Sequence, residues 1–430
     1  MTGFLSEPLR LPCGATLKNR IAKGAMTEGL ADPHNRATAR HQRLYRRWAE
    51  GGAGLLLTGN VQIDRRALER PGNVVIAGEQ SADALAALRD FAKAGTVNGT
   101  HLFMQLSHAG RQTPKAINPH PPAPSAVKLG LPGGNFGVPR AMRGDEIADV
   151  IARFAHAARI ARETGFTGVQ VHAAHGYLLS EFLSPRSNLR TDEWGGSLEN
   201  RARLLLETVK AVRAAVGDDF PVAVKLNSAD FQKDGFSHED CLQVVASLNA
   251  LSIDLLEISG GTYEQPRMMG ASGLEPVFET GTRASTRARE AYFLEYAASI
   301  AKVAQVPLMV TGGFRTKSGM EEALKSGEVD VIGLARPLCV DPAAPQKLME
   351  GRLEVLPSLE KTLRLGPGWL SGNSPFNLIK LLNAMGVQGW FCLQIQRLAE
   401  GQDPDLGLGV FQAFRRYMAA EQAAATALAR

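Results

Sequence analysis

The stretch EIADVIARFAHAARIARETGFTGVQVH, residues 146–172, joins two kinds of segment. Residues 146–165 carry apolar side chains at the three- and four-residue spacing of an amphipathic helix and end in glycine, as helix C-termini tend to. GVQVH, residues 168–172, is a short β-branched apolar run typical of a buried strand. Helices that alternate with such strands build α/β folds with a parallel sheet.

The same alternation extends from residue 20 to residue 340. Eight short apolar runs alternate with longer segments of helical period, such as 82–95 and 198–217. Eight units of this kind predict an α/β fold of the closed (β/α)8 TIM-barrel type rather than an open sheet. We predict strands within residues 20–26, 54–59, 101–106, 168–172, 221–226, 254–259, 307–312 and 330–335.

The segments around this alternation predict three additions to the barrel. LRLPCGATLKNR, residues 9–20, reads as a hairpin that plugs the barrel floor. Residues 109–140 are proline-rich and too long for a simple connection, so we predict an active-site wall there. The alternation stops near residue 345. We therefore expect a barrel domain over 1–345 and a helical C-terminal arm over 346–430, which packs on the barrel or on a second subunit.

Composition narrows the class of protein. The 430 residues are 44% hydrophobic and 21% charged, as in a globular enzyme. The four cysteines contain no C-x-x-C, which excludes a zinc ribbon and argues against a four-cysteine iron–sulfur cluster. No apolar run reaches the roughly 18 residues of a membrane span, and the N-terminus lacks signal-peptide features. We therefore expect a cytoplasmic protein without a membrane partner.

The net charge of +5 does not indicate a nucleic-acid partner, because the basic residues are mixed with 43 acidic ones. The densest basic group falls at helical spacing, and we interpret it as a solvated helix face. It consists of Arg40, Arg43, Arg46 and Arg47. In the arm, Trp390 and Phe391 resemble interface anchors, through which the chain could form a homo-oligomer.

Three proton-bearing rings lie at the C-terminal end of the fourth predicted strand, where a barrel has its catalytic face. They are His172, His175 and Tyr177. One interpretation is a hydrogen-bonded core, and a second is a metal site completed by Glu181. The third is catalytic: two imidazole N–H groups hold a substrate oxygen while the phenol donates a proton. H-x-x-H in a loop is weak metal spacing, so we favour the catalytic interpretation and expect no metal.

Glycine-rich turns end the seventh and eighth predicted strands, where barrels commonly bind a phosphate. They are VTGGF, residues 310–314, and VIGLARPL, residues 331–338, in which Arg336 can add a charged fork. No G-x-G-x-x-G follows a strand and no G-x-x-x-x-G-K-[ST] occurs, which argues against a dinucleotide domain or an ATP site.

Six motifs in order resemble one family, the FMN-dependent ene-reductases of the old yellow enzyme family, also called the NADH:flavin oxidoreductase family. The resemblance covers roughly residues 5–345. It implies a TIM barrel that holds FMN and takes NAD(P)H as co-substrate. The motifs are KNRIAKGAMTEG (18–29), QLSHAGRQ (105–112), APSAV (123–127), HAAHGYLLSEFLSPRSNLRTDEWGGSLENR (172–201), TGGFR (311–315) and GLARPL (333–338).

The resemblance also implies roles for the matching residues. His172 and His175 would bind the substrate's activating oxygen, Tyr177 would donate the proton, and Gly29 falls at a substrate-contacting position. Thr27 would hydrogen-bond flavin O4, Gln105 would read the pyrimidine edge, and Lys225 would lie near flavin N1. The other FMN contacts would be Gly24, Ala25, Met26 and Asn60 at the ring and Gly312, Gly313, Ala335 and Arg336 at the phosphate.

Five positions depart from the family's usual residues and bear on substrate range and flavin potential. Gly24-Ala25 stands where relatives more often have Ser-Pro or Ala-Pro, and Gly29 where some have tyrosine. Lys225 replaces the commoner arginine, and Asn60 replaces alanine or glycine.

Together these features predict an FMN-dependent NAD(P)H oxidoreductase that reduces activated C=C bonds, such as those of enones, in two half-reactions. One alternative is a flavin oxidase or dehydrogenase that acts on quinones, nitro compounds or oxygen. Two others are a hydrolase with paired carboxylates and a binding protein without turnover. The strand ends offer Gln, His, Lys and Gly more than paired acids, which disfavours the hydrolase.

Overall fold

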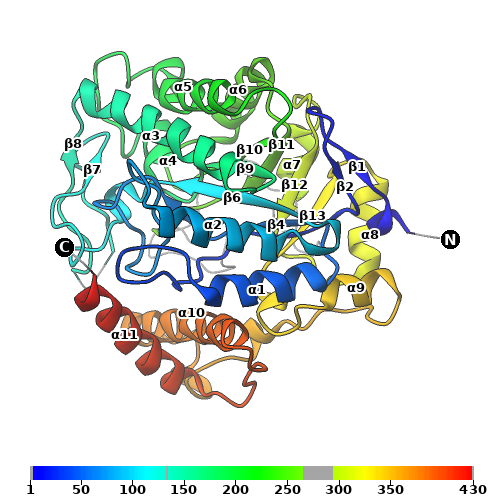
Figure 1. The fold of residues 1–430 in the computed structure, drawn as a ribbon. Coiled ribbons are helices and arrows are strands. Elements are labelled where there is room, and N and C mark those ends of the chain that lie inside the picture. The colour runs from blue at the N-terminus through cyan, green and yellow to red at the C-terminus, as the bar shows by residue number, and fades with distance from the viewer. Residues whose placement is uncertain (1–2, 132–133, 265–293, 429–430) are drawn as a thin grey trace.

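Eight parallel strands close into a barrel in the computed structural model, which describes residues 3–131, 134–264 and 294–428 (Figure 1). Closure follows from β4, which pairs with β3 on one side and with β6 on the other. Each predicted apolar run overlaps one barrel strand. These are β3 (Ile21–Lys23), β4 (Leu55–Leu57), β6 (His101–Ser107), β9 (Gly168–Ala173), β10 (Val222–Asn227), β11 (Leu255–Ser259), β12 (Leu308–Thr311) and β13 (Val331–Leu334).

Helices surround the barrel (Figure 1). Several begin at a Ser or Thr whose hydroxyl accepts a backbone N–H of the first turn, as Ser81, Ser197 and Ser237 do. The helices of the barrel are α1 (Ala39–Glu50), α2 (Ala82–Gly95), α3 (Gly144–Glu163), α4 (Leu178–Leu183), α5 (Leu198–Val216), α6 (His238–Leu248), α7 (Leu294–Ile300), α8 (Lys317–Lys325) and α9 (Ala344–Met349). Short 3-10 turns span Phe4–Ser6, Val97–Gly99, Gly110–Gln112, Asn249–Leu251, Arg336–Cys339, Leu359–Lys361 and Gly368–Leu370.

The predicted hairpin closes the barrel floor, as expected. β1 (Leu9–Arg10) and β2 (Thr16–Leu17) pair antiparallel, and their leucines pack with the inward side chains of the strands. The Asp254 carboxylate, just before β11, accepts the Cys13 N–H at 2.7 Å and pairs with Arg213 at 2.6 Å. The apolar floor consists of Leu9, Leu11, Leu17, Ala22, Leu55, Leu57, Phe103, Ala223, Leu255, Met309 and Val331.

The insertion after β6 lies at the opposite end of the barrel, where the strands have their carboxyl ends (Figure 1). Its short strands β7 (Pro122–Ala123) and β8 (Arg140–Ala141) pair with each other, and β5 (Val61–Gln62) extends the sheet beside β6. Arg111 and the Gly130 N–H both bind Glu264, at 2.8 and 2.7 Å. The insertion thus reaches the loop that follows β11. Residues 132–133 of the predicted wall lie outside the described residues.

The C-terminal arm contains two helices, α10 (Asn377–Ala399) and α11 (Val410–Ala427), which pack together, and α10 lies along α1 (Figure 1). Glycines allow the close approach: a Cβ at Gly389 would lie 2.8 Å from the Tyr417 Cβ. Trp390 is 1% exposed and Phe391 is 7% exposed within this one chain. The prediction that they anchor a second subunit is therefore wrong, because their own chain already covers them.

The basic cluster on α1 is exposed at Arg43 and Arg46, as expected, but it also contacts the arm. Arg40 pairs with Glu400 at 3.2 Å, Arg43 donates to the Ala399 carbonyl at 2.9 Å, and Arg47 pairs with Asp403 at 2.6 Å. Arg46 alone of the four is exposed without a contact to the arm among the interactions described. The cluster therefore holds the end of α10 against the barrel.

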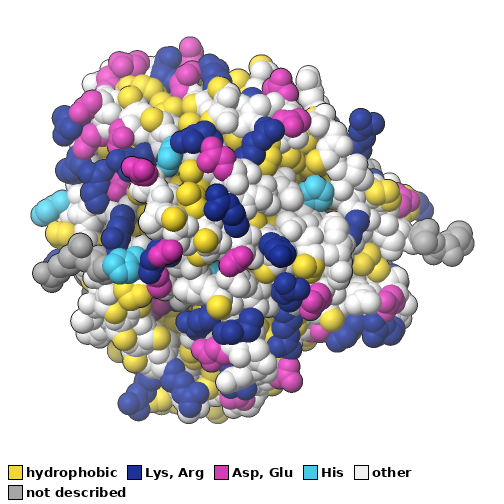
Figure 2. Space-filling model, in the orientation of Figure 1, with side chains coloured by type: hydrophobic (Ala, Val, Ile, Leu, Met, Phe, Trp, Pro, Cys, Tyr) yellow, Lys and Arg dark blue, Asp and Glu magenta, His cyan; other side chains and the backbone are white. Residues whose placement is uncertain are grey.

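The surface mixes the two signs of charge. Figure 2 shows Lys and Arg interspersed with Asp and Glu over the visible face, with apolar side chains between them. Among the described residues, none of the helices has both the length and the apolar character that crossing a membrane would require.

Candidate active site

A hydrogen-bonded polar layer lies above the apolar floor, because inward positions follow every second residue of a strand. Gln105 donates to Gln170 at 2.7 Å, and Gln170 donates to Glu257 at 2.8 Å. The Glu257 carboxylate also pairs with Lys225 at 3.0 Å and accepts the Thr311 hydroxyl at 2.6 Å. Lys225 thus faces a carboxylate, which offsets much of its positive charge.

The two predicted histidines come together one layer higher. His172 lies one residue before the end of β9, and its ring centroid lies 5.1 Å from that of His175. His175 adopts a left-handed backbone with φ of 64°, an uncommon conformation for a residue other than glycine. Its N–H donates to Asn227 at 3.1 Å, and its Nε2 contacts the Ser259 hydroxyl at 2.7 Å. The ends of β9, β10 and β11 therefore hold this turn in place.

Both histidines are neutral near pH 7. Burial, reinforced by the Lys225 charge, holds the pKa of each imidazole well below its usual value. His172 Nδ1 accepts the Ala174 N–H at 3.2 Å, so the ring proton resides on Nε2. A neutral N–H donor can bind a substrate oxygen without bringing a second proton to the reaction.

Tyr177 lies beside the histidines and is 4% exposed. Its ring centroid is 4.9 Å from that of His172. The phenol oxygen contacts the Tyr263 hydroxyl at 2.8 Å and accepts the Asn60 side-chain amide at 3.2 Å. Burial first, and then the Glu69 charge, hold the pKa of Tyr177 well above its usual range, so the phenol keeps its proton at neutral pH.

Glu69 is the centre of the polar contacts here, and sequence reasoning missed it. Its carboxylate accepts the Thr27 hydroxyl at 2.8 Å and the amides of Asn60 and Asn73 at 3.2 and 3.4 Å. The Tyr263 hydroxyl reaches it at 3.4 Å. Tyr263 follows the end of β11 by four residues, so a search of every strand end would have found it. Glu69 lies in a loop without a recognisable pattern.

The segment after β3, predicted to face the flavin, lies against neighbouring strand ends. A Cβ at Gly24 would lie 2.6 Å from a Thr311 methyl carbon. Met26 Sδ is 3.5 Å from Cys339 Sγ, and the Thr27 hydroxyl proton is committed to Glu69. Thr27 would have to exchange that partner in order to donate to a flavin oxygen.

Gly29 lies against the Arg70 guanidinium rather than against the histidine cluster. With φ of 67°, a Cβ at Gly29 would lie 2.6 Å from Arg70 Cζ. Arg70 also donates to the Thr27 carbonyl at 3.2 Å and pairs with Glu421 of α11. The substrate contact of Gly29 stays a prediction.

The predicted phosphate residues converge at the ends of β12 and β13, which are neighbours in the barrel. Gly312 and Gly313 have φ of 102° and 86°, so their backbone takes a course that residues with a Cβ rarely follow. Ala335 precedes the turn that carries Arg336, and the Arg336 guanidinium lies 5.6 Å from the centroid of the Phe391 ring. The arm thus packs beside the predicted phosphate position.

The residues present fit FMN. The amides of Gln105 and Gln170, together with Lys225, offer the mixed donors and acceptors that the pyrimidine edge of the flavin needs. Gly312 and Gly313, together with Arg336, suit a phosphate. Among the described residues, buried Asn60 Oδ1 has no hydrogen-bond partner and could accept a bond from a ligand.

The metal interpretation gains no support. Within residues 3–131, 134–264 and 294–428, no group of three or more His, Cys, Asp and Glu side chains could hold a metal ion. Glu181, the third ligand that interpretation requires, instead accepts the Arg111 N–H at 2.8 Å.

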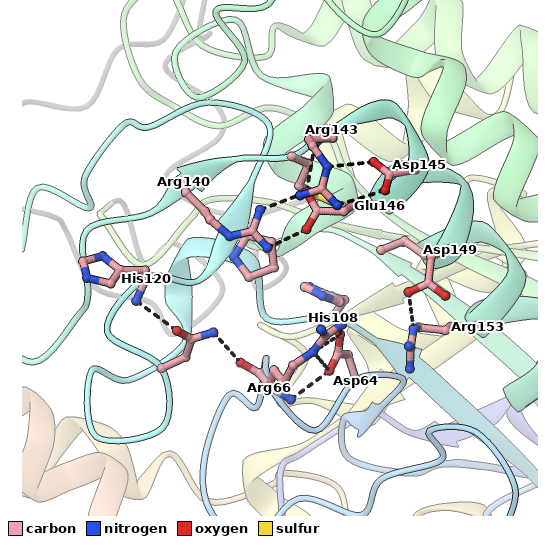
Figure 3. A pocket seen from close by; sticks show the side chains of 14 residues that line it. Asp64, Arg66, His108, His120, Arg140, Arg143, Asp145, Glu146, Asp149 and Arg153 are labelled. Atoms are coloured by element: carbon pink, nitrogen blue, oxygen red, sulfur yellow. Dashed lines mark hydrogen bonds and ion pairs between the residues drawn. The ribbon is translucent and has the colours of Figure 1, made fainter.

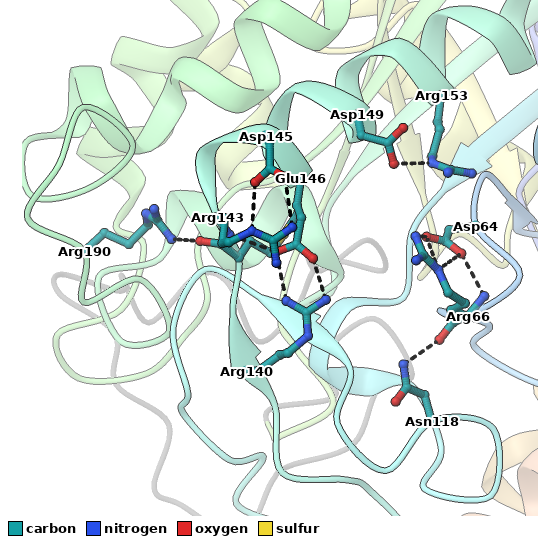
Figure 4. Close-up of polar contacts among 11 residues, drawn as sticks. Asp64, Arg66, Asn118, Arg140, Arg143, Asp145, Glu146, Asp149, Arg153 and Arg190 are labelled. Atoms are coloured by element: carbon teal, nitrogen blue, oxygen red, sulfur yellow. Dashed lines mark hydrogen bonds and ion pairs between the residues drawn. The ribbon is translucent and has the colours of Figure 1, made fainter.

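A cavity of about 460 Å³ lies outside the barrel mouth, between the loop after β5, the insertion and the start of α3 (Figure 3). Its charged side chains pair with one another (Figure 4). Four arginines face four carboxylates, so no net charge is left to select a ligand. The pairs are Arg66–Asp64, Arg140–Glu146, Arg143–Asp145 and Arg153–Asp149. The candidate active site is therefore the mouth, where the predicted residues gather.

Comparison with known proteins shows the family of the chain. Residues 5–354 match the model of the NADH:flavin oxidoreductase / NADH oxidase family. The chain belongs to this family. It is accordingly an NAD(P)H-dependent flavin oxidoreductase with FMN as its cofactor.

Relatives within the NADH:flavin oxidoreductase family include two fungal proteins, each named NADH-dependent flavin oxidoreductase iliE. The Hypocrea jecorina protein is 38% identical over 362 residues, which cover 80% of this chain and 88% of that protein. The Neonectria protein is 40% identical over 356 residues, 79% of this chain but only 46% of that protein. The old yellow enzyme homologue from Zymomonas mobilis is 29% identical with a TM-score of 0.68, covering 84% of this chain and 97% of that one.

Proposed function

We propose that this flavin oxidoreductase reduces activated C=C bonds, such as those of enones. The observation that carries the proposal is the cluster at the end of β9, where two neutral imidazoles and a protonated phenol meet. Such a cluster can bind one oxygen and deliver one proton. A hydrolase would instead need a nucleophile or paired acids at this place.

The two imidazoles bind and polarise the substrate. The carbonyl oxygen of the enone accepts N–H donors from His172 and His175, which stabilise the negative charge that develops on it. The Ser259 contact and the left-handed turn at His175 keep these donors in position before substrate arrives.

The phenol completes the addition. FMN, when bound, supplies the hydride that the β-carbon of the alkene receives, and NAD(P)H replaces that hydride in a separate half-reaction. Tyr177 gives its proton to the α-carbon and is left as a phenolate, which the Asn60 amide stabilises. General-acid catalysis of this kind typically contributes about 10²–10⁴-fold to a rate.

We further propose that Gln105 and Lys225 hold the pyrimidine side of FMN, and that Gly312, Gly313, Ala335 and Arg336 hold its phosphate. Gly24, Ala25, Met26 and Thr27 would lie along the ring. For Asn60, the bonds to Tyr177 and Glu69 favour a role toward the proton donor beside any contact with the ring.

The test is Tyr177→Phe. We expect flavin reduction by NADH to stay within about twofold of wild type, while reoxidation by 2-cyclohexen-1-one slows by about 10²-fold or more. Stopped-flow absorbance measures the two half-reactions separately. Tyr296→Phe is the matched control, since this tyrosine packs on His238 and Phe231, away from the mouth. Equal loss of both half-reactions in Tyr177→Phe would show that the proton-donor role is misassigned.

A second candidate is an oxidase or reductase of acceptors other than alkenes. A Thermoanaerobacter brockii protein named NADH oxidase is 34% identical over 340 residues, 79% of this chain and 49% of that protein. Reoxidation of the reduced enzyme by oxygen, a quinone and a nitroarene, each compared with an enone, distinguishes the two candidates. Faster reoxidation by oxygen than by every enone would favour the oxidase.

A further inference from the structure

If Tyr177 is the proton donor, it must regain a proton after each turnover. Each turnover would leave a phenolate in a place that is 4% exposed, where water does not reach it freely. The group in direct contact with its oxygen is the Tyr263 hydroxyl, 2.8 Å away. Tyr263 is half-buried, and its hydroxyl lies 3.4 Å from a carboxylate oxygen of the half-buried Glu69. These contacts form a path from Tyr177 toward the surface.

We infer that Tyr263 and Glu69 return a proton to Tyr177 after each turnover. This inference rests on the proposed function of Tyr177 and assigns roles to two residues outside the family motifs quoted above. Tyr263 is a relay, and Glu69 is its link to solvent. The 3.4 Å step is long for a hydrogen bond, as catalytic contacts often are before substrate is bound.

The step moves protons only. Tyr263 gives its O–H proton to the Tyr177 phenolate oxygen, and it regains a proton through the Glu69 carboxylate from water or a buffer acid. One proton enters from solvent for each proton that Tyr177 places on the α-carbon. No electron transfer and no further reactant are needed.

The charges around the pair favour reprotonation. After burial, the Glu69 charge is a further cause that raises the pKa of both phenols, so a phenolate left on either oxygen takes up a proton at neutral pH. Four donors fix the carboxylate: Thr27, Asn60, Asn73 and Tyr263. The titratable groups that face Tyr177 are His172 from β9, Glu69 from the loop after β5, Tyr263 from the loop after β11 and Tyr417 from α11.

The kinetic test uses Tyr263→Phe and Glu69→Gln in the FMN-loaded enzyme. The first turnover uses the proton already on Tyr177, so single-turnover reoxidation by 2-cyclohexen-1-one should stay within about threefold of wild type. Steady-state kcat should fall about tenfold or more, and the acid form of imidazole should restore it in part. Flavin reduction by NADH should not change.

A readout independent of turnover is NMR of protein labelled with ¹³C at tyrosine Cζ, with the Tyr177 signal assigned from Tyr177→Phe. That signal should shift in Tyr263→Phe, because a hydrogen bond is lost. In Glu69→Gln the signals of Tyr177 and Tyr263 should titrate at lower pH, because the charge that raises their pKa is gone. Tyr296→Phe should alter neither the Tyr177 signal nor kcat.

Three results would overturn the inference: an unchanged kcat, a first turnover slowed as much as kcat, or a Tyr177 signal that does not respond to Tyr263→Phe. The proposed function fails separately, if Tyr177→Phe leaves enone reduction intact. If Tyr177→Phe reduces the enone slowly while Tyr263→Phe keeps the kcat of wild type, the relay is rejected and the proposed function stands.

Discussion

Glu181 illustrates how one buried side chain makes stability depend on pH. It lies in α4, directly after the turn that carries His175, and is 1% exposed. One carboxyl oxygen accepts the Arg111 N–H, and the other has no partner among the described residues. Burial raises the pKa of Glu181 to about 8, from an ordinary value of 4.5. The folded chain therefore keeps a proton that the unfolded chain releases.

This difference predicts the sign of a pH effect. Below pH 4.5 both states hold the proton, and from there to pH 8 the unfolding free energy falls by up to about 1.4 kcal/mol per pH unit. Glu181→Gln should remove that slope, so the variant gains stability over wild type as the pH rises. Urea unfolding of both proteins at about pH 5 and about pH 8 measures the difference in their unfolding free energy. Glu79→Gln, at an exposed glutamate, is the control, and parallel pH slopes for wild type and Glu181→Gln would contradict the assignment.

The C-terminal arm shows how one element is held by ion pairs of different burial. Arg70, with 5% of its side chain exposed, pairs with Glu421 and lies 5.3 Å from the centroid of the Tyr417 ring. Arg40 of α1 pairs with Glu400, the residue that follows α10, and their side chains are 35% and 48% exposed. Exposed pairs contribute about 0–1 kcal/mol, whereas breaking a buried pair leaves an uncompensated charge. The Arg70–Glu421 pair should therefore dominate the attachment of α11.

The two pairs form a matched test. Glu421→Gln should raise amide hydrogen exchange in α11 by about tenfold or more, which corresponds to about 1.4 kcal/mol of local opening. Glu400→Gln should change exchange in the arm by less than about threefold. Mass spectrometry of exchanged peptides from α10 and α11 measures both. A larger effect from Glu400→Gln would reverse this ranking of the contacts.

The molecule as a whole carries a polarity gradient along the barrel axis. The hairpin and the lowest inward side chains are apolar, the next layer is a network of amides with the Lys225–Glu257 pair, and the histidines end the series. Buried polar layers cost free energy unless their groups are satisfied. A ligand that bonds to this layer should therefore stabilise the entire barrel.

FMN should show this effect in thermal unfolding. The purified protein should be yellow, and removal of FMN should lower Tm by several degrees. Added FMN should restore the Tm, because a ligand at 100 times its Kd adds about 2.7 kcal/mol to the free energy of unfolding. Differential scanning calorimetry with absorbance at the flavin bands measures both. A colourless protein that cannot be reconstituted, or a Tm indifferent to FMN, would contradict the site described here.

The local pattern of residues was enough for the barrel. Each of the eight apolar runs overlaps a strand, and the helical segments at 82–95 and 198–217 match α2 and α5 closely. Periodicity is a property of neighbouring residues, so it survives in the sequence. The rings at 172–177 were found for the same reason, since they lie at the end of a strand and directly after it. The domain boundary at residue 345 stays a prediction.

Contacts between segments that are distant in the sequence could be identified only in the tertiary structure. Tyr263 and Glu69 are 194 residues apart, and Arg70 and Glu421 are 351 apart. No spacing in the sequence indicates which loops meet at the mouth, that Trp390 is buried within its own chain, or that three arginines of α1 contact the arm. Amphipathic patterns show that a face needs a partner, whereas only packing in three dimensions selects that partner and aligns the side chains.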